Sequence, residues 1–451
     1  MFQAFRANSR PLLALMLPIL GTQLAQTGMG VVDTLVAGMA GTVDLAAIAV
    51  GSSIWVPVVL LVSGIMVGLT PLVAQAKGAK DKEASRSALQ QGIYLSFIIG
   101  LLFMLLMLWL TAPILAVMDV TENLIQPTEA YLTYIAYGLP AVAVYQALRS
   151  YNEAVHLTRP ITVIAITGLI INIPLNIMFV NGWGPIDAMG GPGCGVASLI
   201  VFYLATLAAA VYTATSAHHR KIQPLKRFAA PNWEKISKLT AIGVPIGLAI
   251  FVETSLFCVI ALLIARLGAD VVAAHQITLN VSSLLFMVPL SLALALTVQV
   301  GNALGAQNPR KAKQIWKHAL MMNLGFACIN GTLLITLRDS VIALYSQDIA
   351  VAALASSLLF YAAVFQLSDG LQVAAAGALR GYKDTLITLG ITIISFWCIG
   401  LPLGYYLGLS QSAPLGAEGF WMGLVVGLSI NAALLLVRLN FVSKRAMIHT
   451  T

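Results

Sequence analysis

Charged residues are scarce in this sequence. Only 9% of its 451 residues are Asp, Glu, Lys or Arg, whereas 59% are hydrophobic and the mean hydropathy is +0.90. A soluble domain has about 25% charged residues, and one globular core could not bury such an apolar surplus. The composition excludes a cytosolic enzyme, a disordered chain and a secreted disulfide scaffold. It indicates a protein whose main solvent is lipid.

The common motifs of enzyme and metal sites are also absent from the sequence. There is no GxxxxGK(S/T) loop for ATP, no HExxH and no GxSxG. The four cysteines, Cys194, Cys258, Cys328 and Cys398, lie far apart and lack CxxC or Cys/His spacing. Neither a disulfide framework nor a zinc site is therefore indicated. We expect no enzyme activity and no cofactor.

Long apolar runs occupy most of the chain. A membrane-spanning helix needs about 20 mostly apolar residues, which predicts an all-α membrane protein with twelve transmembrane helices. The twelve runs lie at residues 12–36, 48–74, 90–115, 131–151, 161–180, 195–216, 236–264, 274–300, 315–337, 351–379, 386–409 and 419–442. Several contain proline or glycine, which membrane helices tolerate when neighbouring helices satisfy the freed backbone groups.

Basic residues are distributed unequally between the two sides of this topology. Most of the 25 Lys and Arg lie in or next to the tails and the even-numbered loops, whereas only Arg266 and Arg338 lie in odd-numbered loops and Arg149 lies near the end of the fourth span. By the positive-inside rule, both termini are then cytoplasmic. The net charge of +8 follows from this topology. Basic loops that are short and scattered do not predict a nucleic-acid partner.

The sequence contains an internal repeat. Three pairs of landmarks lie 227 residues apart, namely Pro18 and Pro245, Gly41 and Gly268, and Gly78 and Gly305. Six spans in each half return the chain to the same side, so the halves should be related by an axis along the membrane normal, as in some secondary transporters. We therefore expect two pseudosymmetric six-helix lobes, residues 1–226 and 227–451, joined by a solvated basic linker at 217–238.

Three carboxylates, Asp33, Glu253 and Asp369, fall well inside the expected spans. A charge at the bilayer centre costs about 2.5–3.5 kcal/mol, and such residues usually face a transport pathway. The spans contain no equal set of Lys or Arg to neutralise them. In a dry cleft these acids could exchange a proton, or two of them could hold a hard cation such as Na⁺. Protonated acids that merely join helices by hydrogen bonds are the structural alternative.

Polar residues recur at helical spacing near these acids. The pairs that share a helical face are Gln26 with Asp33, Gln366 with Asp369, Asn172 with Asn176, and Asn280 with Met287. Such faces are turned away from lipid, but each amide could equally form hydrogen bonds between helices. Phe286 and Met287 could offer a face to an organic cation, or they could be ordinary packing residues.

Several segments together resemble a known family. They include PILGTQLAQTGMGVVDTLVAG (18–38), INIPLNIMF (171–179), GVPIGLAIFVETSLF (243–257) and FQLSDGLQVAAAGALRGYKDT (365–385), and the paired loops VAQAKGAK and VGNALGAQ are the most specific. With these segments the chain resembles the MATE multidrug and toxic compound extrusion family, NorM-type branch, over residues 10–445. The resemblance implies two six-helix lobes that form a V-shaped central cleft.

The resemblance also implies a function and its residues. It implies export of bulky, often cationic, hydrophobic compounds, driven by inward flow of Na⁺ or H⁺. Glu253 and Asp369 are then the cation-coupling acids and the candidate Na⁺ ligands. The remaining expected residues are Asp33, Asn172, Asn176 and Gln26 in an N-lobe polar site that also couples cations, and Phe286, Met287, Asn280 and Gln366 in the substrate cleft.

These observations predict a secondary active multidrug antiporter of a bacterial inner membrane, working as a monomer by alternating access. Its partners are small-molecule drugs and the lipid bilayer, and its only cofactor-like requirement is the coupling ion. A lipid-linked precursor flippase of related fold is the alternative, although such flippases tend to have more spans and cationic cleft residues. An ion channel is a third possibility. The sequence leaves open whether Na⁺ or H⁺ is used and in which lobe.

Overall fold

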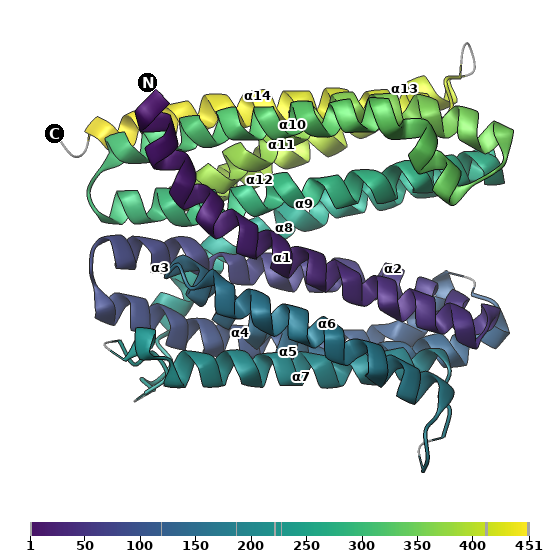
Figure 1. Cartoon of the computed structure of the whole chain (residues 1–451), viewed down its shortest axis with the longest axis horizontal. Coiled ribbons are helices and arrows are strands. Elements are labelled where there is room, and N and C mark those ends of the chain that lie inside the picture. Colours follow the sequence, from purple (N-terminus) through teal and green to yellow (C-terminus); the bar gives the residue numbers. More distant parts are fainter. Residues whose placement is uncertain are drawn as a thin grey trace. The chain divides into compact units, whose positions relative to one another are not determined.

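The computed structural model describes residues 2–118, 120–185, 187–220, 222–226, 228–410 and 414–448. Within these ranges the chain is almost wholly helical, with short connections (Figure 1). Met1, Arg227 and Thr451, which bound the predicted lobes, and Lys221 of the linker lie outside the described residues.

Each predicted span corresponds to a helix or to an interrupted pair of helices. The first half contains α1 (Phe2–Ala40), α2 (Thr42–Val67), α3 (Leu69–Gly78), α4 (Lys82–Val117), α5 (Glu122–Ala154), α6 (Thr158–Asn181), α7 (Gly191–Thr215) and the 3₁₀ turn η1 (Ala217–His219). The second half contains α8 (Trp233–Ile264), η2 (Ala265–Leu267), α9 (Ala269–Gly305), α10 (Pro309–Tyr345), α11 (Ile349–Gly381), α12 (Leu386–Ile393), the π-helical segment η3 (Ile394–Gly400), α13 (Leu401–Leu409) and α14 (Ala417–Ile448).

In the described part of the chain, eleven helical rods are long and apolar enough to cross a membrane. The one predicted span missing from these eleven is the fourth, in α5, whose 33 residues are long enough but whose apolar run is broken by tyrosines, prolines and Gln146. The outer faces of the rods carry large apolar side chains such as Leu262 on α8 and Val437 on α14. Apolar surface of this kind is unfavourable in water, so it indicates contact with lipid. The expected all-α membrane architecture is therefore confirmed.

Glycine interrupts the second rod where two helices meet through their backbones. Gly68 separates α2 from α3, and a Cβ built on it would lie 2.6 Å from Cα of Gly243 on α8. No side chain fits into so short a distance, so both positions need glycine for this approach.

The chain forms two compact units, and each is described separately. One comprises Pro18–Gly247, and the other comprises Met1–Leu17 together with Leu248–Thr451. These units are defined by packing, whereas the predicted lobes follow the sequence repeat. The lobe boundary at residues 226 and 227 therefore stays a prediction.

One central helix organises each unit. In the first, α5 packs against α2, α4 and α7, and its Tyr131 and Leu139 belong to the buried apolar core. In the second, α11 packs against α9, α10 and α14, and Leu358 contributes to a core that includes Trp421. Helices α5 and α11 are therefore the central helices of their units, because each packs against several of the others.

The repeat is visible in the backbone as well as in the sequence. Asp81 and Asn308 are the N-caps of α4 and α10, and their side chains accept hydrogen bonds from the amides three residues further on. Non-glycine residues with positive φ also occur in pairs, namely Lys80 (59°) with Gln307 (58°) and His156 (67°) with Lys383 (62°). The members of every pair are 227 residues apart, so the helix ends obey the same register as the sequence landmarks.

Most described residues of the linker are exposed, as expected of a solvated connector, but the segment is also anchored to the first unit. Side chains on α4 hold the linker backbone: Gln90 donates to the carbonyl of Pro224 (3.0 Å) and Gln91 donates to that of Ala230 (3.2 Å). His219 lies buried beside Asn152, with Nε2 3.0 Å from Oδ1. Burial lowers the pKa of His219 to about 4, with a smaller effect of His218, so the imidazole is neutral at physiological pH. The linker is thus a docked segment of the first unit.

Candidate functional site

The Asp33 carboxylate lies in a polar cluster inside the first unit. Asp33, on α1, is 4% exposed. Its Oδ1 accepts hydrogen bonds from Nδ2 of Asn176 (2.7 Å) and of Asn172 (3.4 Å) on α6, and its Oδ2 accepts one from Ser198 on α7 (3.0 Å). The i, i+4 spacing of the two asparagines places both on the face of α6 that meets Asp33. Three of the residues expected in an N-lobe polar site are therefore in contact.

Gln26 has different partners from those three residues. Its Oε1 accepts a hydrogen bond from Nη1 of Arg149 on α5 (2.8 Å), and Gln23 accepts one from Nη2 (2.6 Å). Arg149 also forms an ion pair with Glu153 (Nε–Oε1 2.7 Å), and both side chains are buried. Gln26 is thus part of an arginine cluster, about two turns along α1 from Asp33.

Glu253 and Asp369 come together in the second unit, on α8 and α11. The amide of Gln372 bridges them, since its Nε2 donates to Oε1 of Glu253 (2.9 Å) and to Oδ1 of Asp369 (3.2 Å). Asn431 on α14 in turn donates to Oε1 of Gln372 (2.6 Å). Asp369 is 2% exposed and Glu253 is partly buried. Two carboxylates held together by one neutral amide concentrate negative charge, which is favourable only when a cation or proton joins them.

Free oxygen ligands are available at this site. Among the described residues, none donates a hydrogen bond to Oδ1 of the buried Asn431. A hard cation prefers carboxylate and amide oxygens, so Glu253, Asp369 and Asn431 are ligands of the right chemical type. Across the described ranges there is no group of three or more His, Cys, Asp or Glu side chains arranged to hold a metal.

Among the described residues, two buried arginines lie near these acids but do not equal them in number, so the expectation that no equal basic set neutralises the acids stands. Arg149 lies inside α5, and Arg380, expected in a loop, lies in the last turn of α11 with 7% exposure. Glu153, also expected in a loop, is buried beside Arg149. The helices continue past the ends of the apolar runs, which brings these charged residues into the protein interior.

The four residues expected in a substrate cleft differ in how exposed they are. Phe286 and Met287 on α9 are half-buried, and Asn280 on the same helix is exposed. Gln366 on α11 is buried, and no described residue pairs with its Nε2. Helices α9 and α11 pack together, but these four side chains do not form one continuous exposed surface. Their role in substrate binding stays a prediction.

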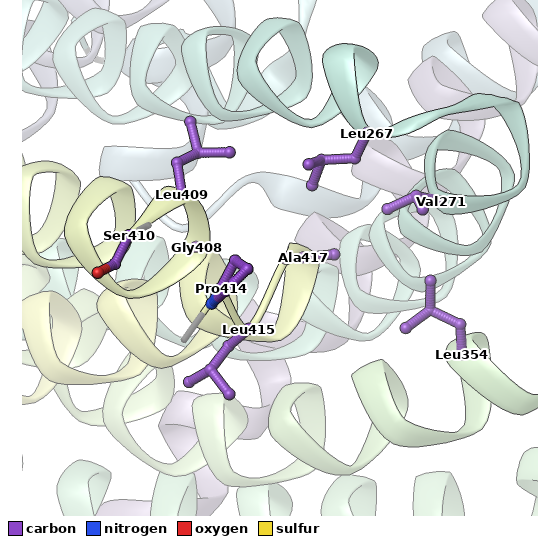
Figure 2. Close-up of a pocket in the computed structure, with 10 residues that line it drawn as sticks. Leu267, Val271, Leu354, Gly408, Leu409, Ser410, Pro414, Leu415 and Ala417 are labelled. Carbon is purple, nitrogen blue, oxygen red and sulfur yellow. The ribbon is translucent and has the colours of Figure 1, made fainter. Parts of the chain in front are cut away.

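A pocket of about 530 Å³ lies elsewhere in the second unit (Figure 2). Leu267, Val271 and Leu354 line it together with residues that flank the connection between α13 and α14, including Leu409 and Leu415. The lining is mostly apolar, with Ser410 as its polar side chain, and contains none of the acids described above. The pocket therefore contributes nothing to charge coupling.

Some contacts of these clusters were not foreseen from the sequence. Asn431 is one of two asparagines in the last apolar run, and Ser198 is one of several small polar residues in its run. Trp397, in the π-helical segment, donates through Nε1 to the carbonyl of Val252, the residue before Glu253 (3.1 Å). A polar residue within an apolar run was the signal available for Asn431. No periodicity pointed to Trp397.

The chain matches a known family model in both of its halves. A family model described as MatE matches it twice, at residues 18–178 and 245–406. The two matches begin 227 residues apart, which is the offset of the internal repeat. The first match includes Asp33, Asn172 and Asn176. The second match includes Glu253 and Asp369.

Curated relatives align over nearly the full length. The chain is 45% identical over 442 residues to the multidrug resistance protein PmpM of Pseudomonas aeruginosa, covering 98% of this chain and 93% of the relative. It is 39% identical over 445 residues to the multidrug resistance protein NorM of Vibrio cholerae, covering 98% and 97%.

Solved structures share the fold. A crystal structure of a eukaryotic MATE transporter superposes with a TM-score of 0.89 at 21% identity, covering 99% of this chain and 100% of that one. A crystal structure of MATE in the bent conformation gives a TM-score of 0.90 at 19% identity, covering 99% and 98%. At these identities the likeness establishes the fold alone.

Proposed function

Because the chain belongs to the MatE family, we propose that it exports organic compounds in exchange for Na⁺ or H⁺, with Glu253 and Asp369 as the acids that bind the coupling ion. The family consists of transporters rather than enzymes, and the relatives named multidrug resistance proteins support multidrug efflux. The chain is thus a multi-pass membrane transporter of small molecules, as the sequence predicted. The ion, the coupling residues and the antiport mechanism belong to the proposal.

One observation supports the coupling site above all others. Glu253 and Asp369 come from different helices and share a single amide donor, Gln372. Two carboxylates in such surroundings repel each other, and a bound cation or proton removes that repulsion. Binding of the ion can therefore change how α8 and α11 pack. A drug that favours the ion-free packing would bind less tightly once the ion has entered, and the reverse would hold equally.

The Asp33 cluster is proposed as a second site at which a cation or proton can bind. Its acid already accepts three hydrogen bonds from Asn172, Asn176 and Ser198, which stabilise the negative charge. Gln26 lies on the same helix as Asp33, but its hydrogen-bond partner is Arg149. Phe286, Met287, Asn280 and Gln366 are proposed to contact the transported compound.

The remaining parts of the proposal concern the cellular setting. We place the protein in a bacterial inner membrane as a monomer, with both termini cytoplasmic, because the basic residues gather in the even-numbered loops and tails. Transport proceeds by alternating access and needs no cofactor besides the coupling ion. The flippase alternative has no specific support, since the acids of the described interior, Asp33, Glu153, Glu253 and Asp369, outnumber the buried arginines Arg149 and Arg380.

Purified protein in liposomes tests which ion is coupled. Vesicles are loaded with the fluorescent cation ethidium, and efflux is followed first under an inward Na⁺ gradient at equal pH and then under an inward H⁺ gradient without Na⁺. We expect one gradient, or both, to accelerate efflux well above the rate of protein-free vesicles. An ionophore that collapses the effective gradient should remove the acceleration. Equal rates with and without either gradient would contradict ion-coupled antiport.

A further inference from the structure

The repeat register pairs the charged clusters of the two units position by position. With the offset of 227, Gln26 corresponds to Glu253 and Glu153 corresponds to Arg380. The register holds at the ends of the two central helices, where the amide of His156 donates to the carbonyl of Glu153 and that of Lys383 donates to the carbonyl of Arg380. The same places in the two units therefore hold groups of different charge.

In the first unit, an internal cation occupies the cluster permanently. Arg149 donates to Gln26, Gln23 and Glu153, so all three of its nitrogens have acceptors. The side chain is 3% exposed. This guanidinium cannot leave, and it contacts the residue that corresponds to Glu253.

In the second unit, the position that corresponds to Arg149 is Ala376. A methyl group replaces the guanidinium, so the chain supplies no internal cation from this position to Glu253. The fixed charge comes instead from Arg380, at the position of Glu153. Arg380 follows Asp369 by eleven residues, which is three helical turns and therefore the same face of α11.

Arg380 is buried without a close acidic partner of its own. No described residue accepts a hydrogen bond from its Nε, and the ion pairs of the described residues do not include it. The nearby acid Asp384 is bound by Arg438 of α14 (Nε–Oδ2 2.6 Å). Arg380 lies one helical turn beyond Ala376, whose counterpart Arg149 contacts Gln26, the counterpart of Glu253.

Other titratable groups on the helices packed around α11 are accounted for differently. His275 of α9 accepts a hydrogen bond from Trp421 of α14 (3.2 Å), and Glu418 of α14 accepts one from Ser357 (2.6 Å). On α10, His318 is half-buried and has an interaction within the protein. The acid pair Glu253 and Asp369 is therefore the buried negative charge that remains for Arg380 to balance.

We propose that Arg380 is a fixed positive charge that weakens binding of the coupling cation at Glu253 and Asp369, and so promotes its release. This inference rests on the proposed function of those acids. When the cation site is empty, Arg380 partly balances the two carboxylates across the low-dielectric interior. When a cation arrives, the two positive charges repel each other, and the ion binds less tightly than it would to the acids alone. Arg380 is a positioning residue for the ion and not a ligand of it.

The test measures the concentration of coupling ion that gives half-maximal ethidium efflux from proteoliposomes. Arg380→Gln is expected to lower this concentration about tenfold, equivalent to about 1.4 kcal/mol, and to lower the maximal rate because release is slower. Arg380→Lys keeps the charge and should stay within about threefold of the wild type. Arg338→Gln, which removes an arginine that is paired with the adjacent Asp339 and is partly exposed, should change neither value.

Each outcome separates this inference from the proposed function. An unchanged or higher half-maximal concentration in Arg380→Gln overturns the role of Arg380. If Glu253→Gln and Asp369→Asn lose ion-driven efflux at the same time, the coupling site itself survives. If those two variants keep it, both ideas fail together. Should Arg380→Gln not fold, the double variant Arg380→Gln/Glu253→Gln should recover a monodisperse protein, and its failure to do so would contradict charge balancing.

Discussion

Replacing Asp369 by Asn, or Glu253 by Gln, is expected to reduce ion-driven drug efflux about 100-fold, which lies in the upper range of typical coupling energies. Both replacements keep the size of the side chain and an oxygen that can accept a hydrogen bond from Gln372. They remove the negative charge that attracts the ion. Initial rates of ethidium efflux from proteoliposomes under the effective gradient measure the loss.

Two controls separate lost coupling from lost structure. Glu418→Gln neutralises an acid of the same unit that bonds to Ser357 and has no part in the proposed site, so its rate should match the wild type. Ethidium binding without the coupling ion should stay within about threefold in the Glu253 and Asp369 variants, because the drug-binding state is the ion-free one. Full efflux rates in both variants would remove the basis of the assigned coupling site.

Replacing Arg149 by Met is expected to destabilise the protein by about 3–5 kcal/mol, because Glu153 is left as an uncompensated charge in the interior. Gln23 and Gln26 lose a hydrogen-bond donor in the same step. At about 2–4 °C for each kcal/mol, the apparent Tm should fall by roughly 10 °C. Thermal unfolding in detergent, followed by tryptophan fluorescence, measures the shift.

The matched variants for Arg149 test whether charge is the cause. Arg159→Met removes an exposed arginine shortly after α5 and should change the apparent Tm by less than about 2 °C, since surface substitutions usually cost under about 0.5 kcal/mol. Arg149→Met/Glu153→Leu removes both buried charges and should recover most of the loss. A double variant less stable than Arg149→Met alone would argue against an uncompensated charge as the source of the instability.

The membrane architecture could be predicted because it follows from local sequence. Twenty apolar residues in a row have few alternatives to a spanning helix, and the expected helices are present. The repeat was also visible, because Pro18 and Pro245 mark the same register that reappears at the helix ends. The family resemblance, which rested on segments such as 243–257 and 365–385, is confirmed by the two matches to the family model.

The charged interior could be predicted only in part, for physical reasons. Asp33 and Asp369 lie in the middle of apolar runs and are conspicuous by their cost. Glu153 and Arg380 lie beyond the apolar runs, so hydropathy assigns them to loops although the helices extend over them. Their burial depends on packing against helices that are distant in sequence.

The contacts between helices were beyond the reach of periodicity as well. A helical face indicates which residues of one helix point together, and this placed Asn172 beside Asn176 correctly. It also placed Gln26 on the same face as Asp33, although in the structure Gln26 accepts a hydrogen bond from Arg149 of α5. Which helix lies opposite a face is decided by the tertiary fold, and so are the partners of each amide.

Drug-driven movement of the coupling ion tests the central claim most directly. Proteoliposomes with equal ion concentrations on both sides are given an outward ethidium gradient, and entry of ²²Na⁺ or acidification of the lumen is recorded. Obligatory exchange predicts that the ion enters as ethidium leaves, although the ion concentration is equal on both sides. It also predicts that Asp369→Asn abolishes this ion entry. Ethidium efflux at the wild-type rate with no movement of either ion would contradict coupled antiport.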